Sequence, residues 1–122
     1  MFVKIAPSPL HGKGCFATQE VPAGDVVVRA KLLTFPPEQT TLLFQTKLKH
    51  YLFWLKDGDP QDGPFHTALA MGPISFCNHS GDANCEFVLD EAAAEITLCA
   101  RRDLEQNEEI TIDYGDWADE II

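Results

Sequence analysis

Three short stretches of this sequence combine residue types that can bind a ligand or take part in a reaction. Gly12-Lys13-Gly14 comes first, and closely spaced glycines let a backbone approach a bound group. Asn78-His79-Ser80 offers an amide, an imidazole and a hydroxyl at consecutive positions. Asp113-Tyr114-Gly115 places a phenol beside a carboxylate. Each stretch alone is a weak signal, because tight turns and buried tyrosines also occur for structural reasons.

The cysteines are a further set of candidates, this time for metal binding. Cys77 and Cys85 flank His79, but their spacing matches no usual zinc pattern. Cys15 and Cys99 make the number even, yet no C-x-x-C pair occurs. We therefore expect reduced thiols and no bound metal.

The composition describes one acidic globular domain. The chain has 122 residues, 45% of them hydrophobic and 23% charged, which suits a single domain with a buried core. Its formal charge of -10 argues against direct binding to nucleic acid and suits a cationic partner, although solubility explains the charge equally well. No signal peptide or membrane span is recognisable, so we expect a soluble intracellular protein, without resolving cytoplasm from nucleus.

The elements that must position these residues are mainly β-strands. Runs of β-branched or alternating residues predict strands at 3–5, 26–30, 85–89, 95–101 and 110–112. A hairpin is predicted with arms at 48–55 and 65–69 and a polar tip at 57–64. Residues 35–49 fit a helix ambiguously, and residues 11–17 predict an exposed loop shaped by its glycines.

A dinucleotide-binding fold is a rival explanation for the glycines. Residues 12–17 match the fingerprint G-x-G-x-x-G/A. That fingerprint opens a long helix, whereas Pro22 and Gly24 follow here almost at once. We therefore exclude a Rossmann fold.

The motifs occur in an order that is more specific than any one of them. They are Gly12-Lys13-Gly14 with Phe16-Ala17-Thr18, then Phe76-Cys77-Asn78-His79-Ser80 with Ala83-Asn84, then Ala100-Arg101-Arg102-Asp103-Leu104 leading to Glu108-Glu109-Ile110-Thr111-Ile112-Asp113-Tyr114-Gly115. This combination resembles the signature segments of the SET family of protein lysine methyltransferases, over nearly the whole chain. The short length, with Tyr51-Leu52-Phe53 and residues 68–72, further resembles the small stand-alone SET proteins of large viruses.

The resemblance implies a mainly β SET-domain fold of several small sheets. In that fold the Asn-His-Ser segment and the C-terminal segment pass through one another in a pseudoknot-like threading, which would bring Asn78, His79 and Tyr114 together. Residues 1–122 are then a single minimal SET domain without a zinc-binding post-SET region. Gly81 stands where many members carry a cysteine, and no cysteine follows Cys99.

The resemblance also implies the site. S-adenosylmethionine is the expected cofactor, held by Lys13, Gly14, Asn78 and His79. Tyr114 would stand at the methyl-transfer point and contact the cofactor. Trp117 would cap the pocket, or a second subunit of a homodimer would complete it.

Tyr51 is the second catalytic candidate, for the lysine channel. A purely structural role beside Phe53 fits its local spacing equally well.

The implied activity is methyl transfer to a lysine side chain of a protein substrate, in a basic segment such as a histone tail. Carboxylates near the C-terminus, Asp113 among them, would attract such a segment, although for most of them a simple solvated face is the favoured explanation. The alternative is a weak or inactive SET-like module that binds basic peptides or scaffolds a partner.

Overall fold

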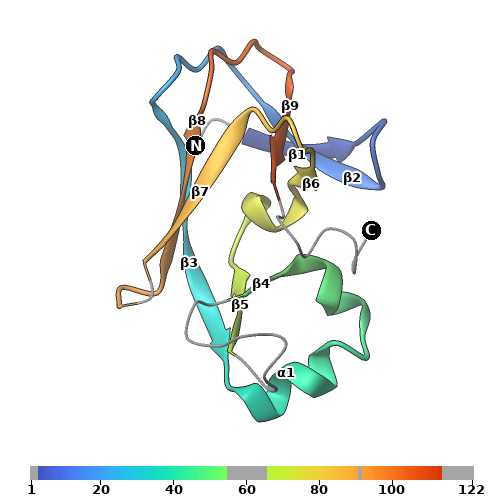
Figure 1. The fold of residues 1–122 in the computed structure, drawn as a ribbon. Coiled ribbons are helices and arrows are strands. Elements are labelled where there is room, and N and C mark those ends of the chain that lie inside the picture. Colours follow the sequence, from blue (N-terminus) through green and yellow to red (C-terminus); the bar gives the residue numbers. More distant parts are fainter. Residues whose placement is uncertain (1–2, 55–65, 91, 114–122) are drawn as a thin grey trace.

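Two β-sheets and a few short helices make up the part of the chain that this computed structural model describes, residues 3–54, 66–90 and 92–113 (Figure 1). The expected mainly β class is confirmed. The small sheet lies at one end of the long strand β3 and the helix α1 lies at the other (Figure 1).

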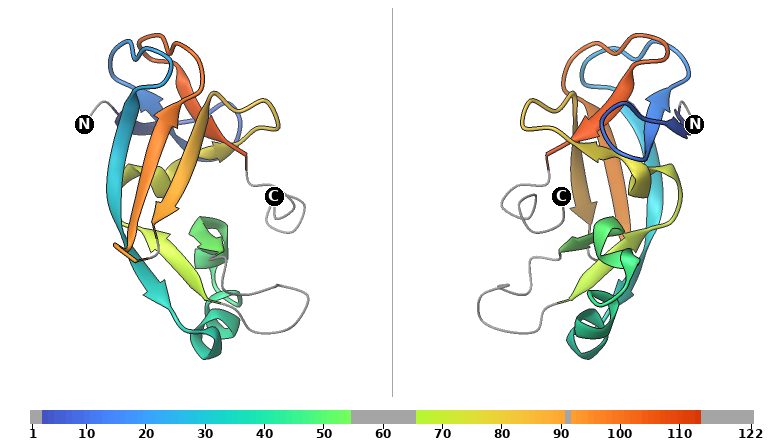
Figure 2. Two further views of the ribbon diagram at one scale, coloured as in Figure 1. Left: turned by 60° about the vertical axis from the view of Figure 1, so that its left-hand side comes forward. Right: turned by 90° about the vertical axis from the view of Figure 1, so that its right-hand side faces the viewer.

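The larger sheet has the strand order β4-β5-β3-β8-β7 and is antiparallel throughout. Its strands are β3 (Val26–Phe35), β4 (Leu52–Trp54), β5 (Thr67–Ala70), β7 (Cys85–Asp90) and β8 (Glu95–Ala100). Strands β3, β8 and β7 run side by side (Figure 2). The pairing of β4 with β5 confirms the predicted hairpin in part, because residues 48–51 of its first predicted arm form a 3-10 helix instead of a strand. The polar tip of the hairpin lies outside the described residues.

Strand β8 shows why this sheet forms where the sequence predicted it. Ile96, Leu98 and Ala100 are buried, and the residues between them are only partly covered. This alternation is the pattern of a strand with one face on a core. The core contains buried residues of both sheets, such as Leu98 from β8 and Ile110 from β9, so the two sheets share it.

The smaller sheet has the strand order β1-β2-β9-β6. Its strands are β1 (Val3–Pro7), β2 (Lys13–Ala17), β6 (Asn78–His79) and β9 (Glu109–Ile112). The C-terminal strand β9 lies inside the sheet, antiparallel to β2 and parallel to β6. Asn78 pairs with Thr111 and His79 with Ile112, which joins the two segments that the expected threading requires to meet.

The prediction of an exposed loop at residues 11–17 is wrong over most of its length. Residues 13–17 form β2, in which Gly14, Cys15 and Ala17 are buried. The strand has neighbours on both edges, so its backbone groups are paired inside the sheet. The turn before β2, with Gly12 at a φ of 46°, stays exposed, as does Lys13 at the start of the strand. A strand here, in place of a helix, supports the exclusion of a Rossmann fold.

Short helices complete the described chain. They are α1 (Pro37–Leu43) and two 3-10 helices, η1 (Lys47–Tyr51) and η2 (Pro73–Phe76). The ambiguous helix at 35–49 is therefore two short pieces, and Pro37 lies in the first turn of α1, where proline costs no hydrogen bond. Among the described residues, α1 is far too short to cross a membrane, and the 3-10 helices are shorter still.

Candidate functional site

A cavity of about 510 Å³ opens between the turn before β2, the end of η1 and the segment from η2 into β6. Its size falls within the range of small-molecule sites, roughly 300–1,000 Å³. The lining combines apolar and aromatic side chains with amide, hydroxyl and imidazole groups, and consists of Leu10, His11, Gly12, Lys13, His50, Tyr51, Ser75, Phe76, Cys77, Asn78 and His79.

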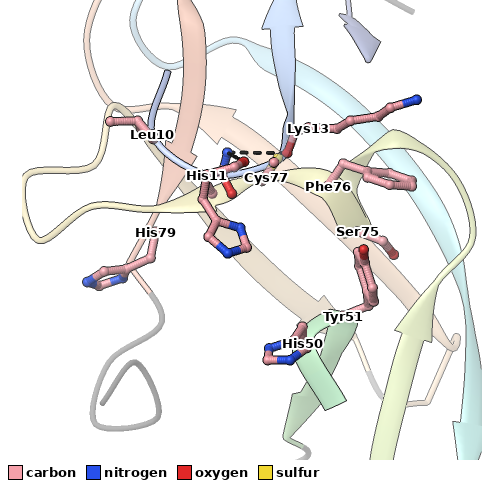
Figure 3. A pocket seen from close by; sticks show the side chains of 11 residues that line it. Leu10, His11, Lys13, His50, Tyr51, Ser75, Phe76, Cys77 and His79 are labelled. Atoms are coloured by element: carbon pink, nitrogen blue, oxygen red, sulfur yellow. Dashed lines mark hydrogen bonds between the residues drawn. The ribbon is translucent and has the colours of Figure 1, made fainter. Parts of the chain in front are cut away.

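The side chains of the lining approach the cavity from different segments. The rings of His11 and His79 lie on one side, and those of His50 and Tyr51 lie across from them (Figure 3). Lys13 extends its amine away from these rings (Figure 3). The contribution of Lys13 to the wall is therefore mainly its backbone.

The side chain of Asn78 ties two walls of the cavity together. Its amide nitrogen donates to the backbone oxygens of His11 at 3.1 Å and Lys13 at 3.3 Å. It also lies 2.9 Å from Glu109 Oε2 and 3.1 Å from Ser8 Oγ. Carbonyls and carboxylates only accept hydrogen bonds, so these neighbours fix which end of the amide is nitrogen. Among the described residues, nothing donates to Asn78 Oδ1.

Gly14 lies behind this wall and does not line the cavity. A Cβ placed on Gly14 would lie 2.4 Å from Glu109 Oε2 and 3.1 Å from Asn78 Nδ2. The first distance is impossible without a shift of Glu109. The second glycine of the G-x-G therefore makes room for the polar contact between Asn78 and Glu109.

Asn84 holds β9 in place on the other side of the small sheet. Its Nδ2 donates to Glu108 Oε2 at 2.9 Å and to the backbone oxygen of Glu109 at 2.8 Å. Its Oδ1 accepts from the backbone nitrogen of Thr111 at 2.9 Å. Asn84 is only 3% exposed, and its whole side chain serves to anchor the C-terminal strand.

Tyr51 lines the cavity at the end of η1. Its ring meets that of Phe76 edge to face, with centroids 5.5 Å apart and planes at 63°. Such pairs hold both rings in a defined orientation. Both residues line the cavity, so the tyrosine both packs and borders the space.

His79 is partly covered and lies near a carboxylate at the end of the same sheet. Its Nδ1 is 3.7 Å from Asp113 Oδ1, and the two side chains are 22% and 50% exposed. At this distance and exposure, the carboxylate orients the imidazole more than it stabilises the fold.

Comparison with known protein families shows to which family the chain belongs. Residues 12–115 match the SET domain. The chain belongs to the SET domain family. The SET match begins at the turn that lines the cavity and extends past β9, so it covers every described lining residue except Leu10 and His11.

Curated relatives of this SET domain are named as histone-lysine methyltransferases. A Chaetomium globosum histone-lysine N-methyltransferase, H3 lysine-4 specific, is 30% identical over 92% of this chain and 11% of its own. An H3 lysine-37 specific histone-lysine N-methyltransferase of Schizosaccharomyces pombe is 28% identical over 95% of this chain and 80% of its own. The chain thus spans about a tenth of the first relative and most of the second.

Solved structures share the fold. A Plasmodium falciparum candidate histone methyltransferase superposes with a TM-score of 0.70 at 18% identity, covering 93% of each chain. A humanized mutant of the Chaetomium thermophilum Polycomb Repressive Complex 2 gives a TM-score of 0.73 at 21% identity, covering 93% of this chain and 15% of that one. These matches agree with the SET-domain fold that the motifs predicted.

The structure brings some of the predicted site residues of this SET domain together. Lys13, Asn78, His79 and Tyr51 line one cavity, and Gly14 lies directly behind it. Tyr114 and Trp117 lie outside the described residues, so their roles stay predictions.

Other residues of the SET domain site were not predicted. His11, His50 and Phe76 line the cavity, and Ser8 and Glu109 support its wall. Glu109 belongs to the motif Glu108–Gly115, so its position in the motif could have drawn attention to it. Nothing in the local sequence distinguishes Ser8, because its partner Glu109 lies about a hundred residues away.

Two buried cysteines of the SET domain, Cys77 and Cys85, keep their thiol protons. A hydrogen bond with Cys15, followed by burial, raises the pKa of Cys77 well above its ordinary value. Burial, with the nearby Cys15 next in effect, raises the pKa of Cys85 to about 12. Only thiolates act as nucleophiles and metal ligands, so these thiols serve the core. Within the described ranges, no group of three or more His, Cys, Asp or Glu side chains is placed to hold a metal ion.

Proposed function

We propose that this SET domain transfers the methyl group of S-adenosylmethionine to a lysine side chain of a protein substrate, in a basic segment such as a histone tail. The observation that supports it most is the position of the cavity: the Gly12-Lys13 and Asn78-His79 motifs line the same space. The family match and the names of the relatives agree with this activity.

The residues present fit the cofactor. The cavity has the volume for a molecule of this size. Asn78 is only 9% exposed, and no described residue donates to its Oδ1. Such an acceptor suits the ammonium or an amino group of the ligand. When bound, S-adenosylmethionine supplies a methyl group on a sulfonium. The backbone at Lys13 and the side chains of Asn78 and His79 would hold it.

Tyr51 would border the substrate lysine. A free lysine has a pKa of about 10.4 and arrives protonated at neutral pH. Aromatic walls such as Tyr51 and Phe76 exclude water and disfavour the charged amine, which lowers that pKa and releases the proton to solvent. Tyr114 is proposed as the catalytic phenol that orients the neutral nitrogen.

The charge of the chain suits a basic substrate. The formal charge is -10, and the half-exposed carboxylate of Asp113 lies beside His79 at the cavity. Long-range attraction of this kind raises the rate of encounter with a Lys-rich segment. The homodimer that the resemblance suggests stays a prediction. Sedimentation equilibrium would measure the oligomeric state.

The test combines binding with turnover. Calorimetric titration with S-adenosylmethionine should show one saturable site, and mass spectrometry of Lys-rich proteins after incubation should show added methyl groups on lysine. Tyr114→Phe should remove most of the transfer rate and leave cofactor affinity nearly unchanged, because it keeps the ring and removes the hydroxyl. Asn78→Ala should weaken cofactor binding first. Binding without transfer to any substrate would contradict the proposal and support the binding module.

A further inference from the structure

Ser8 is the centre of the turn that forms one wall of the cavity. Its hydroxyl accepts from the backbone nitrogens of Leu10 at 3.0 Å and His11 at 3.4 Å. Its own backbone nitrogen donates to the oxygen of Gly12 at 2.8 Å. The turn that presents Leu10, His11 and Gly12 to the cavity therefore closes around this one side chain.

Glu109 connects that turn to β9, an inner strand of the small sheet. The Ser8 hydroxyl donates to the Glu109 carboxylate, 2.8 Å from Oε1 and 2.7 Å from Oε2. Asn78 Nδ2 donates to the same carboxylate at 2.9 Å. The carboxylate thus accepts from both sides of the cavity wall, and hydrogen bonds to a charged acceptor are the stronger kind.

We infer that Ser8 and Glu109 are positioning residues for the cofactor site, an inference that rests on the proposed function. With its nitrogen held by Glu109, Ser8 and the two backbone oxygens, the amide of Asn78 has one orientation. That orientation leaves Oδ1 as the acceptor for a ligand. Ser8 and Glu109 do not line the cavity themselves, so they act through the turn and through Asn78.

Glu108 is a matched control for Glu109, because its carboxylate also binds an asparagine but has a purely structural place. Glu108 precedes Glu109 on the chain and accepts from another motif asparagine, Asn84, at 2.9 Å. Neither Glu108 nor Asn84 lines the cavity. Removing the charge at either position takes a carboxylate from an asparagine amide, but of these two asparagines only Asn78, the partner of Glu109, lines the cavity.

The experiment compares Ser8→Ala, Glu109→Gln and Glu108→Gln with the wild type. Calorimetry with S-adenosylhomocysteine should show about tenfold weaker binding for the first two, because Ser8→Ala removes the hydroxyl that closes the turn and Glu109→Gln presents an amide donor toward Asn78 where the carboxylate accepted. Glu108→Gln should show no comparable loss, because its partner Asn84 does not line the cavity. In methyl transfer, KM for the cofactor should rise by a similar factor while kcat changes little. The double variant Ser8→Ala/Glu109→Gln should lose less than the product of the single effects, since both changes break one network.

Different outcomes separate this inference from the proposed function. Equal losses in Glu109→Gln and Glu108→Gln, or unchanged affinity in Ser8→Ala and Glu109→Gln, would overturn the positioning role while leaving the methyltransferase proposal intact. If the wild type binds no S-adenosylhomocysteine, the proposed function fails. Amide hydrogen exchange then tests separately whether Ser8 structures the turn. Faster exchange at Leu10 and His11 in Ser8→Ala than in Glu108→Gln would support the structuring of the turn. Unchanged exchange would refute it.

Discussion

Asn84 and Thr111 hydrogen bond to each other in both directions. The backbone nitrogen of Asn84 donates to Thr111 Oγ1 at 3.1 Å, and the backbone nitrogen of Thr111 donates to Asn84 Oδ1 at 2.9 Å. The two residues are buried and belong to segments 27 positions apart. This reciprocal pair fixes β9 between β2 and β6, and with it the cavity wall that β6 carries.

Asn84→Ala should destabilise the fold strongly. The change leaves the backbone oxygen of Glu109 and the backbone nitrogen of Thr111 without their partner in a buried place. We expect urea unfolding to show a loss of about 2–4 kcal/mol, from buried polar groups that cost about 1–3 kcal/mol each.

Asp82→Ala is the matched control for Asn84, because its side chain is 97% exposed and lies 3.7 Å from Arg102 on the surface. It should change the free energy of unfolding by less than about 1 kcal/mol. Equal effects of the two substitutions would contradict the anchoring role of Asn84.

Gly14→Ala should destabilise the protein and weaken cofactor binding together. The new Cβ would meet Glu109 Oε2 and push apart the contact between Glu109 and Asn78. Overpacking of this kind costs about 1–3 kcal/mol, measurable by thermal unfolding. Gly81→Ala is the control, since nothing lies within 4 Å of its Cβ position. A fully stable Gly14→Ala protein would show that Glu109 moves aside freely.

Tyr51 separates packing from chemistry. Tyr51→Leu removes the edge-to-face contact with Phe76 and should lower the free energy of unfolding by about 0.5–1.5 kcal/mol beyond the lost burial. Tyr51→Phe keeps that contact, so its stability should match the wild type within about 0.5 kcal/mol. A drop in methyl-transfer rate in Tyr51→Phe at unchanged stability would assign the hydroxyl to the lysine channel. An unchanged rate would leave Tyr51 a packing residue.

Alkaline pH should destabilise the fold partly through Cys85. Its pKa is raised from 9.0 to about 12, mainly by burial, so between these values the folded thiol keeps a proton that the unfolded chain has lost. Stability is therefore full below about pH 9 and falls as the pH approaches 12, by up to about 1.4 kcal/mol per pH unit for this one group. Cys85→Ala should show a shallower fall over the same range in urea titrations. Parallel curves would contradict this assignment.

Strands could be predicted from the sequence where the alternation of apolar and polar residues lies within a single strand. The alternation at residues 95–101 predicted β8, and its buried face is the one expected. The strand at residues 13–17 could not be predicted, because Gly14 has a low strand preference and the segment owes its place to β1 and β9 on either side. Tertiary pairing overrode the local glycine signal there.

For the site too, some residues could be predicted from the sequence and others could not. The resemblance to the SET family, which the motifs carry, implies that Asn78, His79 and Lys13 lie near one another, and they do line one cavity. The support from Ser8 could not be predicted, since its hydroxyl bonds to Glu109 at a separation of 101 residues. From the sequence, the glycines are expected to let the backbone approach a bound group, whereas the structure gives another reason for Gly14, the Glu109 carboxylate that would collide with its Cβ.

The interior place of β9 in the small sheet has a consequence for biosynthesis. Because a ribosome makes the chain from the N-terminus, β2 and β6 emerge before the strand that separates them. Strand β2 can pair with β1 at once, but its other edge and the short strand β6 must wait without β9, exposed to other nascent chains, until residues 109–112 leave the exit tunnel. Such high contact order predicts slow maturation, in which the ligand cavity is among the last features to appear.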